Sequence, residues 1–354
     1  MPQSPPEGEI TLPYIPAQLK SVEAGRGIAA VLVVLYHASG SIFSSSKYWH
    51  CVIFDGLFDF GYAGVEFFFV LSGFIIAFAH WSDIGDQNRL DNFIRRRLAR
   101  IYPVYWLVLG AIIILASIGF GPPLPPAADI FSSILLVGAN YHKTIVGVAW
   151  TLYHEVLFYA IFSMIIWRPL VGLAVGGAAI TVSVLNVTGF ELALPLYWQA
   201  PVNLLFPMGI VAWRVSLKPW DGAWLAIAAA LAFLATGLEV VYVRILSETT
   251  TQLMFGAAAA CGISGAVAYE RQQAIVVPTL LVKLGSASYS IYLVHFALLS
   301  AFAQFAKYCG LIDRAPAEAE FTIVVGMTLL ASYQFHKFVE RPLLAMLRPR
   351  RVVS

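Results

Sequence analysis

Residues 25–37, GRGIAAVLVVLYH, form an apolar run with one basic residue near each end. Arg26 and His37 lie eleven residues apart, which on an α-helix corresponds to about 20° of rotation and about 16 Å along the axis. Both side chains therefore share one face of one helix. Ionisable groups inside a membrane span are costly and usually face a cavity or the bundle interior. The alternative is that Arg26 extends to the lipid headgroups and His37 lies at the opposite interface.

The composition of the 354-residue chain indicates a membrane protein. Hydrophobic residues make up 59% of the chain and charged residues 12%, whereas soluble domains average about 25% charged residues. At about 20 residues per span, the chain has room for about ten helices. We predict an all-α integral membrane protein with a single membrane domain over residues 21–342. Residues 1–20 are expected to be a polar tail rather than a cleavable signal peptide, and residues 343–354 a basic tail.

Ten apolar segments are predicted as spans. They cover about residues 22–40, 62–80, 101–119, 149–167, 170–188, 200–216, 222–241, 251–269, 285–306 and 319–337. An even number of crossings returns both termini to one side, and most of the 22 Lys and Arg residues fall on that side. The opposite side holds Lys47, Lys143, Arg244, Lys307 and Arg314. Because cytoplasmic loops carry an excess of Lys and Arg, both termini are predicted to be cytoplasmic.

Two connections on the predicted outer side, residues 41–61 and 120–147, are longer than a simple turn. The second contains the apolar residues 130–138, which are too few to span and predict an interfacial or re-entrant helix. The three cysteines form neither a disulfide framework nor a metal cluster. A bridge between Cys51 and Cys309, both in outer loops, is left open.

Six blocks of sequence, in the same order, resemble those of the membrane acyltransferase 3 family. The first is the pair Arg26 and His37. The others are residues 64–74 (GVEFFFVLSGF), 96–103 (RRLARIYP), 150–159 (WTLYHEVLFY), 288–295 (SYSIYLVH) and 340–342 (ERP). Thr151 stands where the family often has serine. Residues 22–30, VEAGRGIAA, are most similar to the exopolysaccharide O-acetyltransferase branch. Because the chain ends soon after residue 342, we expect no additional extracytoplasmic esterase-like domain.

His37 and Glu66 are the candidate catalytic residues. Each is predicted near the outer end of its span, at a similar depth, on helices that follow one another in the chain. A carboxylate beside a histidine fixes its tautomer and raises its basicity, as a general base requires. The alternative for Glu66 is a protonated carboxyl group hydrogen-bonded to the backbone.

A cluster of arginines precedes the third predicted span. Arg96, Arg97 and Arg100, together with Arg26, are predicted to bind the phosphates of acyl-CoA at the cytoplasmic mouth, because a guanidinium matches phosphate geometry. The cluster, which also includes Arg95, is equally suited to anchoring the helix against anionic lipid. The two roles are compatible.

Five further residues are predicted to line the cavity or to orient the acceptor. They are Trp150, Tyr153, Glu155, Tyr292 and His295. A buried carboxylate must be paired or neutral, so Glu155 is expected to face the cavity, where it orients a substrate hydroxyl or braces the bundle. His295 lies near mid-membrane and either lines the tunnel for the acyl donor or acts as a polar brace.

These features predict an O-acyltransferase, in particular an O-acetyltransferase, of the bacterial inner membrane. Acyl-CoA from the cytoplasm is the expected co-substrate, and the acceptor is a hydroxyl of a surface polysaccharide or a lipid-linked sugar. His37 is predicted to act as the general base, and an acyl intermediate on this histidine is the variant mechanism. We expect no permanently bound cofactor, no metal and no nucleic acid partner. Membrane lipids are expected neighbours, and a homo-oligomer is left open.

Two other classes of protein remain as alternatives. A transporter or flippase of polyprenyl-linked sugars also needs about ten helices and a polar interior, but the purified protein would transfer no acyl group. A non-catalytic partner of a polysaccharide synthase would tolerate the loss of His37 as long as the fold persists.

Overall fold

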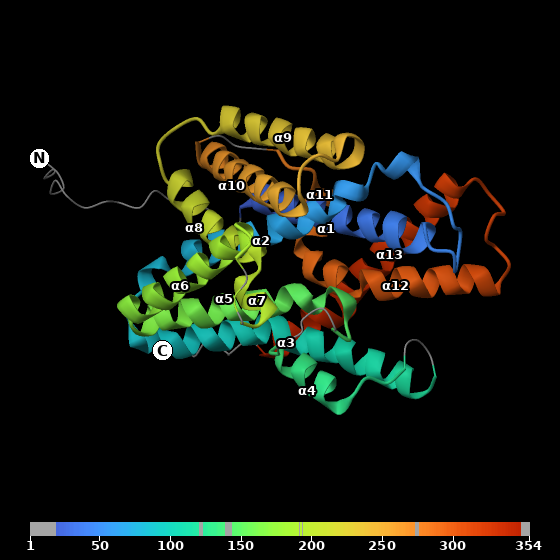
Figure 1. Cartoon of the computed structure of the whole chain (residues 1–354), viewed down its shortest axis with the longest axis horizontal. Helices are drawn as coiled ribbons and strands as arrows, with labels where there is room; N and C mark the ends of the chain where they lie inside the picture. Colours follow the sequence, from blue (N-terminus) through green and yellow to red (C-terminus); the bar gives the residue numbers. More distant parts are fainter. Residues whose placement is uncertain are drawn as a thin grey trace, which may run out of the picture.

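The chain folds as a bundle of helices (Figure 1). The structure is a computed structural model, and it describes residues 19–119, 123–138, 144–190, 192, 194–272 and 276–347. Within these residues no β-strand occurs, so the predicted all-α class is confirmed. Most of the predicted tails (residues 1–18 and 348–354) and parts of the second long outer connection (residues 120–122 and 139–143) lie outside the described residues.

Eight helices in the described part of the chain are long and apolar enough to cross a membrane. With their short extensions they cover Lys20–Phe43, Asp59–Asp83, Gln87–Ser117, Gly147–Trp167, Pro169–Val187, Ala223–Val243, Glu248–Gln272 and Ser288–Tyr308. Their α-helical portions are α1 (Lys20–His37), α2 (Ala63–His80), α3 (Gln87–Ser117), α5 (Trp150–Trp167), α6 (Pro169–Val187), α9 (Ala223–Leu238), α10 (Glu248–Gln272) and α12 (Ser288–Tyr308).

Two of the ten predicted spans differ from these eight. α8 (Leu205–Ser216) has 12 residues, about 18 Å of helix, which is shorter than a hydrocarbon layer of about 30 Å. α13 (Ala317–Phe335) has 19 residues, but Glu318 and Glu320 in its first turn lower its mean hydropathy. By length and composition, the structure therefore supports eight spans where the sequence predicted about ten.

Four shorter helices complete the described fold: α4 (Ala127–Leu135), α7 (Leu196–Gln199), α11 (Thr279–Ser286) and α14 (Arg341–Leu347). α4 lies where the sequence predicted a short interfacial or re-entrant helix. The last turn of α4 accepts three hydrogen bonds at its backbone carbonyls. The donors are the side chains of Tyr102, Tyr105 and Trp106 of α3, at 2.8, 2.8 and 2.9 Å. These donors satisfy carbonyls that a helix end leaves unpaired, and so they hold α4 against α3.

Close backbone contacts set the position of α2. α1 packs against α2, α11 and α12, and α2 also packs against α8, while Figure 1 shows α9 beside α10 and α12 beside α13. A Cβ added at Gly64 would lie 2.3 Å from the carbonyl oxygen of Ala29, and one at Gly73 would lie 2.0 Å from that of Phe206. Only glycine permits these approaches, so α2 lies directly against both α1 and α8.

α3 begins at Gln87, about four turns before the start of the predicted span at residue 101. The carboxylate of Asp86 accepts a hydrogen bond from the backbone N–H of Asn88 at 3.0 Å and caps the helix. About two turns later Arg95 pairs with Asp91 at 2.9 Å. The arginine cluster therefore lies on a helix and not in a loop, and only one face of that helix is turned toward the bundle interior.

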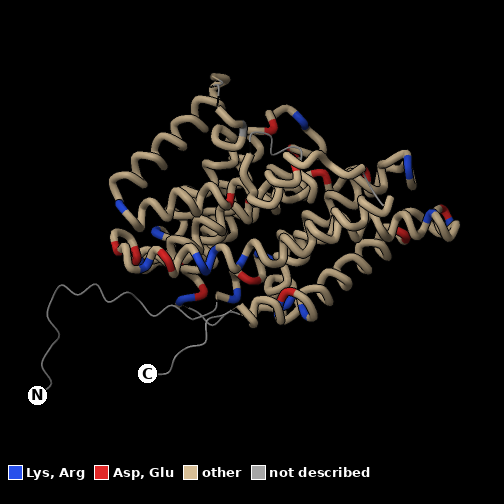
Figure 2. Tube along the Cα trace, turned by 90° about the horizontal axis from the view of Figure 1, so that it is seen from below, with Lys and Arg blue, Asp and Glu red and all other residues tan. Residues whose placement is uncertain are grey.

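The charged residues are distributed unevenly along the bundle. Figure 2 shows Lys and Arg gathered toward one end of the helices, with fewer at the other end. This asymmetry is the pattern expected of a membrane protein. That the basic end faces the cytoplasm stays a prediction.

The cysteines do not form the bridge that the sequence left open. Cys51, Cys261 and Cys309 are free thiols.

Candidate active site

A cavity lies between α1, α2, α3, α5 and α12. Along α2 its wall extends from Val65 to Ile76, about 16 Å of helix. Along α5 its lining residues Thr151, Glu155 and Tyr159 recur every fourth position, so one face of that helix is turned toward the cavity. The cavity is therefore an elongated space parallel to the helices.

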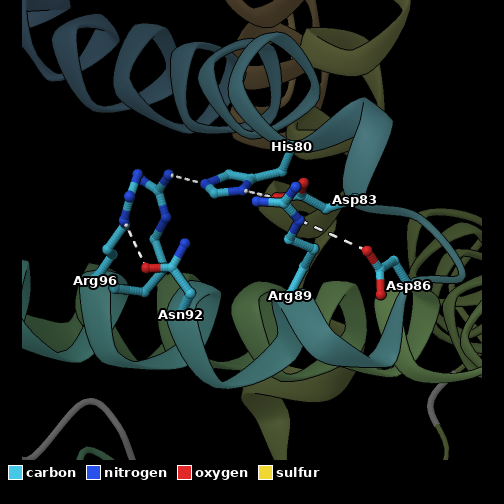
Figure 3. Close-up of polar contacts among 7 residues, drawn as sticks. His80, Asp83, Asp86, Arg89, Asn92 and Arg96 are labelled. Atoms are coloured by element: carbon cyan, nitrogen blue, oxygen red, sulfur yellow. Dashed lines mark hydrogen bonds and ion pairs between the residues drawn. The ribbon is translucent and has the colours of Figure 1, made fainter. Parts of the chain in front are cut away.

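Three of the four arginines predicted to bind acyl-CoA line this cavity. Arg97 and Arg100, one turn apart on α3, line the end near Ile76, and Arg26 of α1 lines the wall. Arg26 pairs with Glu23 at 3.2 Å. Arg96 does not line the cavity, and its side chain donates to Asn92 at 2.9 Å (Figure 3). Arg97 belongs to the buried stripe of α3, which includes Phe93 and Ile101, whereas Arg100 is exposed where it lines the cavity.

Arg97 is in contact with a histidine that the sequence analysis did not single out. A terminal nitrogen of its guanidinium lies 2.6 Å from Nε2 of His80, at the end of α2. The rings of Phe93 and Tyr159, which pack against each other with centroids 6.2 Å apart, each have the centroid 5.7 Å from the guanidinium carbon. A histidine at the end of an apolar helix, followed after three residues by Asp83, was the sequence signal for this contact.

Glu155 lies within the cavity, as predicted. Its Oε1 accepts a hydrogen bond from the hydroxyl of Tyr159, and the hydroxyl of Ser72 lies 3.5 Å from the same oxygen. A carboxylate thus stands between the arginine end of the cavity and its opposite end, held by a residue one turn along its own helix.

The opposite end of the cavity is lined by hydroxyl groups. The hydroxyl of Tyr292 lies 2.9 Å from that of Thr151 and donates to the carbonyl oxygen of Val148 at 3.0 Å. Of the five residues predicted to line the cavity, Glu155 and Tyr292 do so. Trp150 packs against Phe69 with ring centroids 6.2 Å apart.

Tyr153 and His295 also lie outside the cavity lining. The hydroxyl of Tyr153 is 3.4 Å from that of Ser132, next to α4. His295 lies one turn beyond Tyr292 on α12 and is fully buried. It pairs there with the histidine of the first block, His37.

His37 and His295 form a hydrogen-bonded pair. Nδ1 of His37 lies 3.2 Å from Nε2 of His295, and the ring centroids are 5.0 Å apart. Nδ1 of His295 contacts the carbonyl oxygens of Ile291 and Tyr292 at 3.0 and 2.7 Å. Since a carbonyl only accepts, this nitrogen carries the proton and Nε2 of His295 is an acceptor.

The pair also defines the tautomer of His37. Its Nδ1 faces two acceptors, Nε2 of His295 and the carbonyl oxygen of Val33 at 3.0 Å, so in the neutral ring Nδ1 carries the proton. Nε2 of His37 therefore holds the lone pair. A half-buried imidazole held in one tautomer has the geometry that a general base requires.

Glu66 does not take the predicted position beside His37. Gly64 of α2 lies against Ala29, and Gly61 lies against Leu32, so α1 and α2 are antiparallel. His37 is eight residues beyond Ala29, about 12 Å along α1, whereas Glu66 lies on the opposite side of this contact. The two residues are therefore at different depths, and the predicted contact between them is corrected to a contact of His37 with His295.

Glu66 is instead enclosed within the bundle. Its side chain is 2% exposed, and its Oε2 has no hydrogen-bond partner among the residues that the structure describes. It lies on α2 next to Val65, which lines the cavity, but does not line the cavity itself.

Comparison with known proteins agrees with the sequence blocks. Residues 19–336 match the profile of the acyltransferase domain of the acyltransferase 3 family. The chain is 32% identical over 318 residues to the exopolysaccharide production protein ExoZ of Rhizobium meliloti (strain 1021), covering 84% of this chain and 94% of ExoZ. It is 27% identical to the acyltransferase MdmB of Streptomyces mycarofaciens, covering 95% of this chain and 94% of MdmB. No solved structure matches the chain.

A third relative covers a smaller part of the chain. Protein 2 in the picA locus of Rhizobium radiobacter is 28% identical over 187 residues, which are 46% of this chain and 85% of that protein. The family match itself extends over most of the described residues and over every long apolar helix. The chain therefore belongs to the acyltransferase 3 family and is a multi-pass membrane acyltransferase.

Proposed function

We propose that this acyltransferase moves an acyl group, in particular an acetyl group, from acyl-CoA to a hydroxyl of a surface polysaccharide or lipid-linked sugar. The observation that carries the proposal is the elongated cavity, which has Arg97 and Arg100 at one end. The pair of His37 and His295 lies about one helical turn beyond the opposite end of the cavity. The arrangement suits a donor with phosphates at one end and a thioester at the other. In the proposed setting, the bacterial inner membrane, the arginine end faces the cytoplasm.

The arginines supply the argument for the donor. Guanidinium groups bind phosphate through two parallel hydrogen bonds, and coenzyme A carries its phosphates at the end far from the sulfur. Arg97 is buried, while Arg100 and Arg26 line the same space. Arg95 and Arg96 are exposed and do not line the cavity, and they are suited to contacts with anionic lipid. We therefore assign docking to the first three and anchoring to the other two.

The acceptor end follows from the tautomer of His37. The acceptor hydroxyl gives its proton to Nε2 of His37 as its oxygen attacks the carbonyl carbon of the thioester. The carbon–sulfur bond then breaks, the acyl group remains on the acceptor oxygen, and the thiolate of coenzyme A takes up the proton. His295 keeps the ring of His37 oriented throughout, because it accepts from Nδ1. Tyr292, with its ring centroid 6.0 Å from that of His295, lies between the cavity and the base.

The relatives support the class of acceptor. ExoZ is named as an exopolysaccharide production protein and MdmB as an acyltransferase. The alignment with ExoZ covers 84% of this chain and 94% of ExoZ. We therefore propose a polysaccharide or its lipid-linked precursor as the acceptor.

Two measurements test the proposal. Mass spectrometry of the surface polysaccharide should show one acyl increment fewer in cells that lack the protein. Purified protein in proteoliposomes should transfer labelled acetyl groups from acetyl-CoA to that polysaccharide or its precursor. Unchanged acylation in the cells would contradict the proposal. A purified protein that moves the sugar across the membrane without acylating it would identify a transporter instead.

A further inference from the structure

His80 and Asp83 hold Arg97 from outside the cavity. Nε2 of His80 lies 2.6 Å from a terminal nitrogen of Arg97, and Nδ1 of His80 lies 2.7 Å from Oδ2 of Asp83. Figure 3 shows His80 and Asp83 at the end of α2, facing α3. His80 is 3% exposed and Arg97 is 9% exposed. The three residues thus form one chain of contacts that begins at the partly exposed Asp83 and ends at the cavity wall.

The chemistry of the partners determines the proton positions in this chain. Arginine only donates hydrogen bonds and an ionised aspartate only accepts them, so His80 carries its proton on Nδ1 and its lone pair on Nε2. Asp83 fixes the orientation of the ring, and the ring fixes one edge of the guanidinium. Carboxylates behind metal-binding histidines act in the same way, by orienting the ligand and raising its basicity.

Aromatic rings restrain Arg97 as well. Phe93 and Tyr159, which pack against each other, both contact the guanidinium, and this packing opposes rotation of the group. Nε of Arg97 has no hydrogen-bond partner in the described part of the chain, so the protein leaves part of its donor capacity unused. A buried donor without a partner is costly.

We infer that His80 and Asp83 are positioning residues, which hold Arg97 in the orientation that binds a phosphate of the acyl donor. The inference rests on the proposed acyl-CoA donor and adds the residues that prepare its site. The exposed pair of Arg95 and Asp91 on the same α3 provides a contrast. Its side chains are 79% and 71% exposed, no histidine lies between them, and such surface pairs contribute little.

The test is acetyl-CoA binding and transfer by the full chain in nanodiscs. Asp83→Asn removes the charge behind His80 and keeps the shape, and His80→Leu removes the acceptor for Arg97. We expect each to raise the acetyl-CoA Kd by about tenfold, the lower end of what the loss of such a supporting partner costs, with kcat nearly unchanged. His80→Gln, which keeps an acceptor atom, should restore part of the affinity. Asp91→Asn is the matched control and should leave the Kd unchanged.

A double variant separates positioning from a general effect on the fold. In the Arg97→Ala background, Asp83→Asn should raise the Kd no further, because the residue through which Asp83 acts is absent. A further rise, or a lower kcat at an unchanged Kd, would overturn the inference. If Arg97→Ala alone left the Kd unchanged, the proposed donor site would be wrong. If Arg97→Ala bound acetyl-CoA weakly while Asp83→Asn bound it normally, only the positioning role would be refuted. Should His80→Leu fail to fold, the isosteric Asp83→Asn still decides the question.

Discussion

At the scale of single residues, His37 has the proton arrangement of a base because of its partner on α12. His295 accepts from Nδ1 and leaves Nε2 of His37 free to take a proton. We expect His37→Ala to reduce acyl transfer by about 10²–10⁴-fold, the range for losing a positioned proton acceptor. Binding of acetyl-CoA should persist, because the arginines lie at the other end of the cavity. Single-turnover transfer and donor binding in proteoliposomes measure both on the same sample.

The partner of His37 is identified by a second pair of variants. His295→Phe removes the acceptor for Nδ1 while keeping a ring, and should reduce transfer more than Glu66→Gln, because Glu66 lies at a different depth from His37. The reverse order would restore Glu66 as the orienting residue. Substantial transfer by His37→Ala at neutral pH would exclude His37 as the base.

Arg100 is the second residue whose role is testable alone. A charge-assisted hydrogen bond to phosphate contributes about 1.5–3 kcal/mol, so Arg100→Ala is expected to raise the acetyl-CoA Kd about tenfold or more. Arg96→Ala, only four positions earlier but outside the cavity lining and bonded to Asn92, should leave it unchanged. Calorimetry measures both values. Equal affinities for the wild type and Arg100→Ala would leave only an anchoring role for this arginine.

At the scale of helices, the contact of α2 with α8 depends on the absence of a side chain at Gly73. An added Cβ would lie 2.0 Å from the carbonyl oxygen of Phe206, so the helices would have to separate. We expect Gly73→Ala to destabilise the protein by about 1–3 kcal/mol, as overpacking of a tight contact does. Gly110 of α3 has no atom within 4 Å of its Cβ position, so Gly110→Ala should be neutral or slightly stabilising. Thermal unfolding in detergent compares the two, and equal stabilities would contradict the close packing.

At the scale of the whole molecule, the orientation in the membrane decides which compartment supplies the donor. In a chain whose three cysteines are replaced by serine, Asn88→Cys lies at the basic end, at the start of α3, and Val52→Cys lies in the connection between α1 and α2. We expect an impermeant thiol reagent to label position 52 in intact cells and position 88 only after permeabilisation, because the basic end should remain in the cytoplasm. The opposite labelling would place the arginine end of the cavity outside and remove the argument for a cytoplasmic donor.

The sequence by itself determined the membrane class, the family blocks and the arginines, because hydropathy and residue spacing within one helix are local properties. The shared face of Arg26 and His37, and the short helix in the second long connection, follow from the same local rules. The spacing of the buried stripe on α3 places Arg97 in line with Phe93 and Ile101, but it does not separate Arg100 from Arg96, because residues four positions apart lie on the same side of a helix.

Only the tertiary structure decided which side chains meet. His37 pairs with His295, 258 residues later, and Arg97 meets His80 across two helices. The depth of Glu66 relative to His37 was misjudged because it depends on where Gly64 lies against α1, and not on the distance of each residue from its predicted helix end. Periodicity shows which face of a helix turns inward, but the partner on that face depends on the packing of another helix, and such contacts connect residues far apart in the chain.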